Sequence, residues 1–577
     1  MNRHAIYHIT DVPYAYGKDL DTLSIVLRTA KNDIKKCELY YKDRYDWEND
    51  FNVVEMYIKN KTDLFDYYHV DISVDRNRYR YYFKLTDLYG NSFYLDERGI
   101  RNNEIDRKEA TAFQYPYIAK GDLYDEVKWL QESVVYQIFV DRFCNGDSSN
   151  NPPNVLEWGE EVTRTSMFGG DLKGIINKLD YLMELGIDLI YLTPIFKSSS
   201  NHKYNIGDYF VIDPQFGDIE DAKELVKQCH KRNMKIVLDA VFNHSGDDFF
   251  AFEDIVKNGD SSLYKDWYLV DSYPIDKERV NYYTFANNVY TMPKFNISNK
   301  EVTQYLLNVA KFWIDEVGVD GWRLDVCDEV DHDFWRAFKK TVKEANHNAI
   351  IVGEIMHEAT SFLKGDQLDS IMNYPFKGAL IDFFAKRSIS VQQFSEILAQ
   401  NRVIYIESIT RQLWNLFGSH DTQRFLTECK NDIKRMKLAI AFQFCYIGVP
   451  YIYYGDEIGL DGGEEPLSRK CMIWDKEKQK RELFDLYKRL IKIRKENSEL
   501  IYGEYNEIYC NNNVIVFERV NNDNNKVIVA INNNEIEVEV ELNLYKNFKE
   551  LLNNNDREIE ENLVLAPMEF KILKMIK

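Results

Sequence analysis

Short apolar runs alternate with longer amphipathic segments through the middle of the chain. Apolar runs without polar alternation are typical of strands that are covered on both faces, as in a parallel sheet. The amphipathic segments between them predict helices, and Gly186 and Gly318 stand where helices are expected to end. Repeated strand and helix units predict a (β/α)8 TIM barrel. The runs are 134–140, 188–196, 234–242, 320–326, 349–355 and 450–455, and the helical segments are 220–232, 302–317 and 334–345.

The two ends of the chain have β patterns instead. Residues 1 to about 125 contain strand-like segments at 23–27 and 79–85, the second followed by a turn-like Asp-Leu-Tyr-Gly. After a predicted helix at 476–496, strand-like runs are separated by Asn-rich turns, since Asn tolerates left-handed backbone conformations. This C-terminal part predicts a small β-sandwich.

We therefore expect an α/β protein with three domains. These are an N-terminal β-domain at 1–125, a barrel at 126–497 and a C-terminal β-sandwich at 498–577. The stretch from about 245 to 298 interrupts the rhythm after the third strand and is rich in aromatic and turn residues. It predicts a lobe inserted on the C-terminal face of the barrel, where barrels carry their active sites.

Composition and charge narrow the ligand class. The chain has 577 residues with 45% apolar and 29% charged residues, which is typical of a globular protein. A net charge of -21 argues against nucleic acid, because binding a polyanion needs clustered Lys and Arg. The 40 Tyr and 9 Trp suit stacking on sugar rings, although most are expected in cores or half-buried strands.

The eight cysteines show no CxxC pair and no regular spacing, so they predict neither a zinc site nor a disulfide framework. They are expected to be reduced and mostly buried. The N-terminus lacks the apolar region of a signal peptide, and there is no apolar run of about 18 residues. We expect a cytoplasmic protein without a membrane segment.

Four polar clusters stand at the C-terminal ends of predicted barrel strands. Because those ends converge on one mouth, side chains far apart in sequence are expected to meet there. One acidic residue alone would be better explained as a solvated strand cap, but four coincident clusters favour a site. The clusters are Asp239 with Asn243 and His244, Arg323 with Asp325, Glu354, and His420 with Asp421.

This set of side chains fits the cleavage of glycosidic bonds with retention. That reaction needs a carboxylate nucleophile and a carboxyl proton donor roughly 5 to 5.5 Å apart. Asp325 and Glu354 follow consecutive predicted strands and could meet this distance. Crowding by Asp325 and Asp421 would keep Glu354 protonated, and Arg323, on the same strand face as Asp325, would keep Asp325 ionised.

Several motifs carry a resemblance that covers essentially the whole chain. Four of them resemble, in order, the signature regions of the α-amylase family, glycoside hydrolase family 13. Others resemble its neopullulanase, cyclomaltodextrinase and maltogenic amylase subgroup, and the first 125 residues resemble that subgroup's starch-binding-type β-sandwich. The signature motifs are DAVFNH (239–244), GWRLDVCDE (321–329), GEIMH (353–357) and FGSHD (417–421). The subgroup motifs are MPKFN (292–296), NHKYNIGDYF (201–210), GGDLKGI (169–175), EVDHDFW (329–335), YYGDEIG (453–459), CELYYKDRYDW (37–47) and YLDERG (94–99).

The resemblance implies roles for individual residues. Asp325 would be the nucleophile, Glu354 the acid/base and Asp421 a residue that grips substrate hydroxyls in the transition state. Tyr204 would be a stacking platform, although Tyr204 and His202 could also be ordinary core residues. The implied substrate-binding residues are His202, Tyr204, Asp239, His244, Arg323, His420 and Glu329.

A second group of residues suits calcium. Hard oxygen ligands at short, irregular spacing fit Ca²⁺, although an ordinary Asn and Asp loop would have the same composition. The group resembles the subgroup's structural calcium site near the first barrel strand. Its members are Asn145, Asp147, Asn150, Asn151, Gly169 and Asp171.

Some positions depart from the subgroup's pattern. Where the subgroup usually reads VANE after the nucleophile, this chain has Val326, Cys327, Asp328 and Glu329, and Met356 replaces a usual Trp. These positions lie toward the leaving-group side. They leave hydrolysis intact but leave open the balance between water and sugar acceptors.

The resemblance implies hydrolysis of α-1,4 and some α-1,6 bonds in cyclodextrins, maltooligosaccharides and pullulan, with side transglycosylation. A glucosyltransferase or isomerase on the same barrel is an alternative, and a non-catalytic glycan-binding scaffold is another. The subgroup also implies a homodimer in which the N-terminal domain covers the partner's active-site mouth. Trp47 is expected to pack within the N-terminal sandwich, whereas Tyr45 either packs there or reaches a partner's site.

Overall fold

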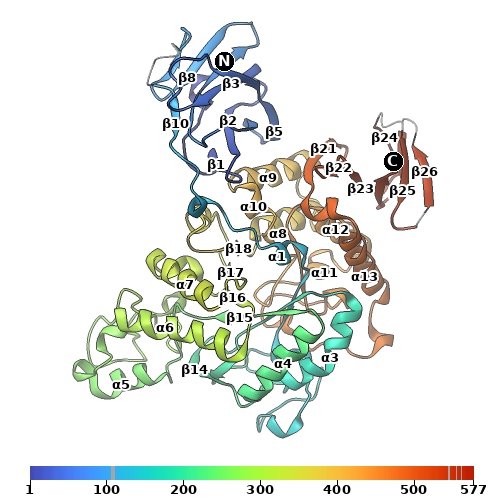
Figure 1. Cartoon of the computed structure of the whole chain (residues 1–577). Coiled ribbons are helices and arrows are strands. Elements are labelled where there is room, and N and C mark those ends of the chain that lie inside the picture. The colour runs from blue at the N-terminus through green and yellow to red at the C-terminus, as the bar shows by residue number, and fades with distance from the viewer. Residues whose placement is uncertain (106–110, 543–545, 554, 560–561, 577) are drawn as a thin grey trace. The chain divides into compact units, whose positions relative to one another are not determined.

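The computed structural model describes residues 1–105, 111–542, 546–553, 555–559 and 562–576. The chain forms two compact units (Figure 1). Unit 1 comprises Met1–Glu126 with Ile389–Thr410, and unit 2 comprises Val127–Ser388 with Arg411–Lys577.

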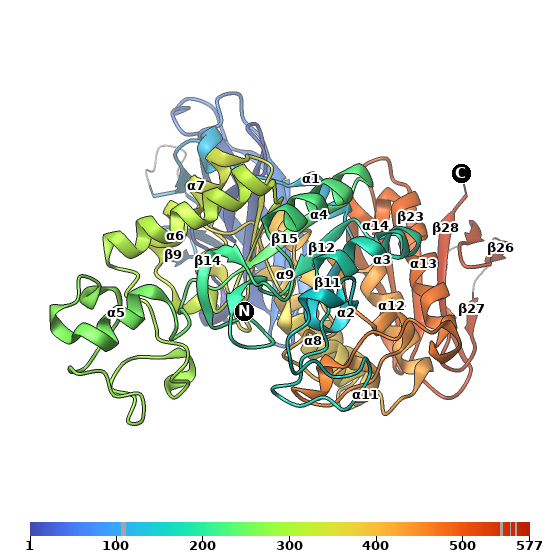
Figure 2. The ribbon, with the colours of Figure 1, turned by 90° about the horizontal axis from the view of Figure 1, so that it is seen from below.

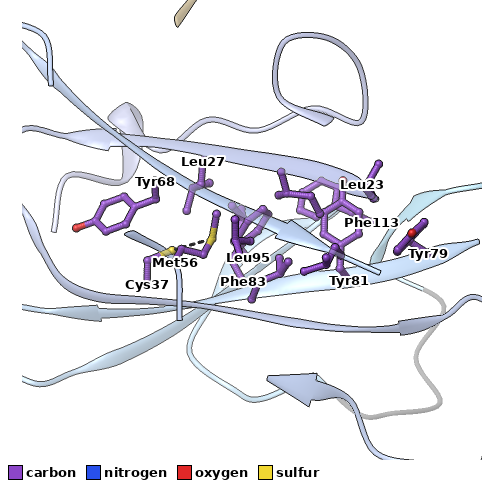
Figure 3. Packing of buried hydrophobic residues seen from close by; sticks show 14 of the residues in the cluster. Leu23, Leu27, Cys37, Met56, Tyr68, Tyr79, Tyr81, Phe83, Leu95 and Phe113 are labelled. Atoms are coloured by element: carbon purple, nitrogen blue, oxygen red, sulfur yellow. Dashed lines mark hydrogen bonds between the residues drawn. The ribbon is translucent and has the colours of Figure 1, made fainter. Parts of the chain in front are cut away.

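Unit 1 is built around two antiparallel sheets. One has the strand order β1-β2-β6-β5, and the other has the order β4-β3-β7-β8-β9, with β10 paired to β7. Alternate residues of β2, Leu23, Ile25 and Leu27, point inward and are fully buried. Figure 3 shows Leu23 and Leu27 packing with Tyr81 and Phe83 of β7. The strands are β1 (Ala15–Gly17), β2 (Leu23–Ala30), β3 (Ile34–Asp43), β4 (Asn52–Glu55), β5 (Tyr57–Lys61), β6 (Phe65–Ile72), β7 (Tyr79–Asp87), β8 (Ser92–Asp96), β9 (Gly99–Arg101) and β10 (Phe113–Tyr115).

Two helices from the middle of the sequence complete unit 1. They are α9 (Val391–Val403), which begins with a capping box at Ser390, and α10 (Glu407–Thr410). Ion pairs join them to the rest of the unit, from Lys31, which follows β2, to Glu396 at 2.7 Å and from Lys59 of β5 to Glu407 at 3.0 Å. These helices fall within the 126–497 range that the sequence assigns to the barrel.

His8 makes the stability of unit 1 dependent on pH. Its ring is buried, with Nδ1 at 2.8 Å from the Val26 carbonyl and Nε2 at 2.9 Å from the Tyr81 hydroxyl. Burial lowers the pKa of His8 to about 4, although the bond to Val26 opposes this shift. The ring therefore binds a proton more readily in the unfolded chain, whose His pKa is about 6.5.

We expect His8 to weaken the fold as the pH falls. Its contribution is present above pH 6.5 and is lost between pH 6.5 and 4, at up to about 1.4 kcal/mol per pH unit. His8→Gln removes this titration. The difference in free energy of unfolding between the parent and this variant, measured by urea denaturation, should shrink across that range. A difference that stays constant from pH 7.5 to 4.5 would contradict this assignment.

Unit 2 contains an eight-stranded parallel sheet with the order β18-β17-β16-β15-β12-β11-β20-β19. A parallel bridge between Met372, next to β18, and Trp414 of β19 joins the first and last strands. The prediction of a (β/α)8 barrel is confirmed. The strands are β11 (Val135–Ile138), β12 (Leu189–Leu192), β15 (Lys235–Ala240), β16 (Gly321–Leu324), β17 (Ile350–Gly353), β18 (Ser370–Ile371), β19 (Trp414–Asn415) and β20 (Val449–Tyr453).

Amphipathic helices cover the outside of these strands, as α3 and α4 do in Figure 2. Both predicted stop signals are in place, because Gly186 follows α3 with φ 99° and Gly318 follows a π-helical turn with φ 83°. The helices are α1 (Lys128–Glu132), α2 (Val140–Phe143), α3 (Leu172–Leu185), α4 (Ile219–Lys231), α6 (Lys300–Phe312), α7 (His332–Ala345), α8 (Tyr374–Leu380), α11 (Phe425–Glu428), α12 (Ile433–Cys445), α13 (Arg481–Glu496) and α14 (Ser498–Tyr502).

The segment after β15 forms a lobe that includes α5 (Phe250–Asn258). Figures 1 and 2 both show α5 away from the barrel strands. A backbone bridge between His244 and Lys294 connects the two ends of the lobe. A hairpin of β13 (Phe196–Ser198) and β14 (Ile206–Ile212) lies between β12 and α4 in the sequence.

The end of the chain forms a β-domain in unit 2. One sheet has the order β21-β22-β23-β28-β25-β26, and the second pairs β24 with β27. Val516, Ile528 and Leu565 are among its buried core residues. The strands are β21 (Glu504–Asn511), β22 (Val514–Val520), β23 (Lys526–Asn532), β24 (Val538–Glu541), β25 (Lys546–Glu550), β26 (Asn555–Ile559), β27 (Asn562–Leu565) and β28 (Phe570–Met575).

Two further sequence expectations concern membranes and thiols. Within the described residues, no helix has the length and apolar character needed to cross a membrane. The thiols of Cys37, Cys229, Cys327, Cys429, Cys445 and Cys471 are free and buried.

Candidate active site

The ends of three adjacent barrel strands bring the predicted carboxyl groups together. Asp239 lies in β15, Asp325 directly follows β16 and Glu354 directly follows β17. In register, Asp239 is opposite Arg323. A cavity of about 600 Å³ opens over these strand ends. Of the predicted residues, it is lined by His202, Tyr204, His244, Asp325, Glu329, Glu354 and Asp421.

Arg323 connects three carboxyl groups beneath this cavity. Its Nη1 is 3.0 Å from Asp239 and 3.0 Å from Asp325 Oδ1, and its Nη2 is 2.7 Å from Glu354 Oε1. The guanidinium is fully buried, so these ion pairs are screened little by water. The sequence predicted its contact with Asp325 but not that with Glu354.

Burial shifts the pKa values of these carboxyl groups. Burial and the facing Glu354 carboxyl raise the pKa of Asp325, and burial raises the pKa of Glu354, whereas Arg323 lowers both. Burial also raises the pKa of Asp239 to about 6. Two buried carboxyls beside one guanidinium favour a state with one proton between them. One ionised and one protonated carboxyl is the pair that retaining glycoside hydrolysis uses.

A network of hydrogen-bonded polar side chains lies next to these carboxyl groups. Gln137 donates to Nδ1 of His420 at 2.8 Å, so the proton of this ring is on Nε2. That Nε2 lies 2.7 Å from the Tyr204 hydroxyl and 3.1 Å from Asp421. The Tyr204 hydroxyl also donates to Asp239 at 2.9 Å, and its ring is nearly parallel to that of His420. Both side chains are therefore fixed before a substrate binds.

The histidines of the site are neutral. Burial lowers the pKa of His202 to about 3 and that of His244 to about 3, and it places the pKa of His420 well below its usual range. A neutral imidazole can both donate to and accept from a hydroxyl group. These rings suit a neutral ligand that is rich in hydroxyls.

Three family models match the chain in succession. Residues 1–119 match "Alpha amylase, N-terminal ig-like domain", residues 137–503 match "Alpha amylase, catalytic domain", and residues 509–570 match "Alpha amylase, C-terminal all-beta domain". The chain belongs to the α-amylase family. It is therefore a glycoside hydrolase, and the resemblance noted in the sequence is confirmed.

Individual relatives of this family are similar over nearly the whole chain. A cyclomaltodextrinase from Thermoanaerobacter pseudethanolicus is 46% identical over 100% of both chains. Neopullulanase 2 from Thermoactinomyces vulgaris is 44% identical over 93% of this chain and 92% of its own. A solved structure of a cyclomaltodextrinase superposes with a TM-score of 0.95 and 37% identity, covering 100% of both chains.

The loop after Asp325 has an uncommon backbone in this α-amylase family member. Val326 has φ 45°, a left-handed conformation that strains a β-branched residue. Its N–H donates to Glu354 Oε2 at 3.3 Å. The next carboxylates along this loop are Asp328 and Glu329. Glu329 pairs with Lys294 of the MPKFN motif at 2.8 Å. The lobe is thus tied to the loop after Asp325.

Sequence reasoning missed several residues of the site. Arg469 contacts Asp421 at 3.1 Å and donates to the His420 carbonyl at 2.8 Å. The Tyr374 hydroxyl donates to Glu354 Oε1 at 3.3 Å. Phe285 and Met292 of the lobe line the cavity. Arg469 ends a short 3-10 helix, Leu467–Arg469, in the segment after β20, and only the MPKFN motif offered a signal for Met292.

The predicted calcium residues also come together. Asn145 donates to Asn151 Oδ1 at 2.8 Å, and Asp171 accepts bonds from the Gly146, Asp147 and Gly174 backbone and from Asn150. Asp147 pairs with Lys173 at 2.9 Å. Within the described part of the chain, no three His, Cys, Asp or Glu side chains form a metal cluster. The predicted carboxylates here are those of Asp147 and Asp171, so a cation in this loop would also need amide and backbone oxygens.

Proposed function

We propose that this chain is a retaining α-glucan hydrolase with Asp325 as nucleophile and Glu354 as acid/base. One observation carries the proposal: Arg323 holds both carboxyls, at 3.0 and 2.7 Å, at adjacent strand ends in the same cavity. This places the two carboxyls beside one guanidinium, and double displacement requires one of them ionised and the other protonated.

The reaction follows from these positions. The Asp325 carboxylate attacks the anomeric carbon and displaces the leaving sugar, whose oxygen takes the proton of Glu354. Water then attacks the same carbon and gives its proton to Glu354, and Asp325 is released. Asp421, His202 and His244 would bind hydroxyls of the sugar, and Tyr204 would stack on it. His420 would position Tyr204 and Asp421, Asp239 and Arg323 would support the carboxyls, and Glu329 would fix the cavity wall.

We propose α-1,4 bonds, with some α-1,6 bonds, in cyclodextrins, maltooligosaccharides and pullulan as the substrates, with side transglycosylation. The names of the similar cyclomaltodextrinase and neopullulanase support this range. Initial rates on β-cyclodextrin, pullulan, soluble starch and maltotriose, together with NMR of the first product, test it. The α-anomer should form first. A first product of β configuration would overturn retention, and larger oligosaccharides dominating throughout would indicate a transferase.

We propose a homodimer in which the N-terminal domain narrows the partner's cavity mouth. Tyr45 is 58% exposed, so part of its ring is open to a sugar, although the guanidinium groups of Arg44 and Arg78 lie 5.6 and 4.8 Å from the ring centroid. Trp47 packs on Arg80 at 4.0 Å but keeps 42% of its surface exposed.

Tyr45→Ala should therefore reduce the ratio of β-cyclodextrin to starch hydrolysis without changing the sedimentation of the dimer. Replacing an exposed tyrosine of the lobe, Tyr283→Ala, is the matched control. A monomeric parent at micromolar concentration, or an unchanged ratio in Tyr45→Ala, would refute the model.

We also propose a structural calcium ion, held by the Asn145 to Asn151 loop with Gly169 and Asp171. Asn150 Oδ1 is buried and accepts no hydrogen bond from the described residues. A Cβ at Gly169 would lie 2.3 Å from Asn151 Oδ1, so only glycine lets these groups converge. These donors fit Ca²⁺, which would cross-link two loops and take no part in the chemistry.

Removing calcium should lower the melting temperature by several degrees while leaving the catalytic residues in place, because the ion binds only the folded state. Scanning calorimetry before and after chelation, with metal content measured in parallel, checks this. Asn150→Ala should abolish the response to chelator. An unchanged melting curve after confirmed metal removal would show that the loop needs no ion.

We propose a cytoplasmic location, which the buried free thiols support, because cytosolic thiols stay reduced.

A further inference from the structure

Lys203 stands between two residues of the cavity wall, but its own side chain is fully buried. His202 and Tyr204 line the cavity, whereas the Lys203 ammonium group lies 5.2 Å from the centre of the Phe216 ring. Lys203 and its two neighbours belong to the loop of residues 199–205, between β13 and β14. The catalytic steps use no such group, although burying a charge is costly. A buried lysine at this position therefore needs another explanation.

The ammonium group of Lys203 has a partner for each of its three N–H bonds. Nζ lies 2.9 Å from Asp213 Oδ2 and donates to Gln215 Oε1 at 3.0 Å and to the Ser198 carbonyl at 3.1 Å. Asp213, which directly follows β14, is also buried, and its Oδ2 accepts from the Ser198 N–H at 2.9 Å. The ion pair therefore joins the last residue of β13 to the segment after β14 and closes the loop at its base.

The backbone of Lys203 is left-handed, with φ 65°. This conformation is unfavourable for a residue with a Cβ, and glycine would adopt it without strain. The lysine is thus explained by its side chain and not by its backbone. Stability alone does not explain it either, because apolar residues of similar volume often serve a fold equally well in place of a buried ion pair. What the bonds of Nζ provide is a fixed direction for the peptide group that follows Lys203.

That peptide group sets the tautomer of His202. The N–H of Tyr204 belongs to it and donates to His202 Nδ1 at 3.1 Å. A backbone N–H can only donate, so Nδ1 carries no proton and the neutral ring has its proton on Nε2. Within the described part of the chain, Nε2 has no hydrogen-bond partner. Its N–H is therefore available to a ligand in the cavity.

His202 depends on this loop more than Tyr204 does. The hydrogen bonds of the His202 ring go to Ser200 Oγ at 3.1 Å and to the Tyr204 N–H, both in the loop itself. The Tyr204 hydroxyl is instead held by Asp239 at 2.9 Å and by His420 at 2.7 Å, both outside the loop. A shift of the loop would move His202, whereas the Tyr204 hydroxyl has independent anchors.

We propose that Lys203, through its ion pair with Asp213, positions His202 so that its Nε2–H is presented to the sugar in the cavity. This inference rests on the proposed function, in which His202 binds a sugar hydroxyl. Lys203 itself touches no substrate, so it is a positioning residue. Its effect on catalysis should appear only where His202 is present.

A double-mutant cycle between Lys203 and His202 tests this inference. Lys203→Met keeps most of the side-chain length and removes the ammonium group. It should lower kcat/KM for maltotriose about tenfold, the scale of one hydrogen bond in the transition state, but less than about twofold when combined with His202→Ala. The melting temperature should fall equally in both backgrounds. A purely structural role would instead lower kcat/KM equally in both.

The tautomer of His202 gives a readout that needs no substrate. Long-range proton–nitrogen NMR of protein labelled with ¹⁵N-histidine distinguishes a ring protonated on Nε2 from one protonated on Nδ1. His202→Ala assigns the signal. The parent should show the Nε2–H form alone at neutral pH, and Lys203→Met should show both forms.

Two further variants control for folding. Lys339→Met removes another largely buried lysine, which pairs at 3.0 Å with Asp369, directly before β18 and so at the strand ends opposite the cavity. It should lower the melting temperature without changing kcat/KM or the His202 signal. Gln215→Leu removes one acceptor of Lys203 Nζ and keeps the ion pair, so it should fold even if Lys203→Met does not. It should give the same pattern with a loss of about two- to threefold.

The outcomes separate this inference from the proposed function. Equal losses of kcat/KM in both backgrounds, or a His202 tautomer unchanged in Lys203→Met, would overturn this inference and leave the assignment of Asp325 and Glu354 intact. If Lys203→Met does not fold, the same two results in Gln215→Leu decide. A parent that hydrolyses none of the glucans would overturn the proposed function, and the His202 tautomer would then decide the positioning by itself.

Discussion

Asp325→Asn should lower turnover of maltotriose and β-cyclodextrin by roughly 10⁴-fold or more, as removal of a nucleophile does in other hydrolases. The amide keeps the shape of the side chain and its contact with Arg323, but it cannot form an ester with the anomeric carbon. Substrate binding should survive, because His202, Tyr204 and His244, which line the cavity and which we propose contact the sugar, are untouched. Single-turnover kinetics and calorimetric binding of maltotriose measure the two effects separately.

A second variant tests whether Asp325 reacts or only positions the substrate. Asp325→Gly leaves space for a small anion, and azide should then restore activity and yield a glycosyl azide of β configuration. The Asp315→Asn variant controls for loss of one negative charge. Near-normal turnover in Asp325→Asn, or an α-glycosyl azide, would exclude Asp325 as the nucleophile.

The sequence predicted most of the barrel because its strands are buried runs. Six runs of apolar residues correspond to β11, β12, β15, β16, β17 and β20. The remaining strands, β18 (Ser370–Ile371) and β19 (Trp414–Asn415), have two residues each and no run to detect. Their pairing depends on the bridge from Met372 to Trp414, a contact between segments far apart in the sequence. Closure of the barrel could be inferred only from the repeat.

The assignment of α9 to unit 1 shows another limit. Its sequence is that of a helix that begins with a capping box, as α4 of the barrel also does, and no linker composition marks a boundary at 389 or 410. What assigns it is pairing with distant residues, such as Lys31 with Glu396. Local pattern carries no information about such partners.

The sequence predicted those residues of the candidate site that lie at the ends of barrel strands. Asp239, Asp325 and Glu354 stand at or beside strand ends, and barrel topology alone brings them together. Arg469 ends a three-residue 3-10 helix in the segment after β20, and its contact with Asp421 depends on the path of that segment. The Val326 conformation, with φ 45°, likewise has no signal in the residue type, which disfavours it.

Glu354→Gln should lower glycosylation by about 10² to 10⁴-fold for glucans, whose leaving sugars need a proton, and much less for a nitrophenyl maltoside. The glutamine amide cannot protonate the leaving oxygen. It can still accept from Tyr374 through Oε1, but its NH₂ group would face the Val326 N–H, so one hydrogen bond is also lost. The loss of this hydrogen bond should slow every substrate equally. Its effect can therefore be distinguished from the loss of proton donation, which affects only substrates that need the proton.

The comparison of the two substrate types therefore isolates proton donation by Glu354. Tyr374→Phe, which removes the hydroxyl that bonds to Oε1 and to Ser419, is the matched control and should slow both substrates by the same small factor. Pre-steady-state release of nitrophenol reports glycosylation directly. Because burial raises the pKa of Glu354 and the acid must hold its proton, the parent's rate on glucans should fall as the pH rises through that pKa, and Glu354→Gln should lack this alkaline limb. An equal loss on both substrate types, with the alkaline limb retained, would assign proton donation to another group.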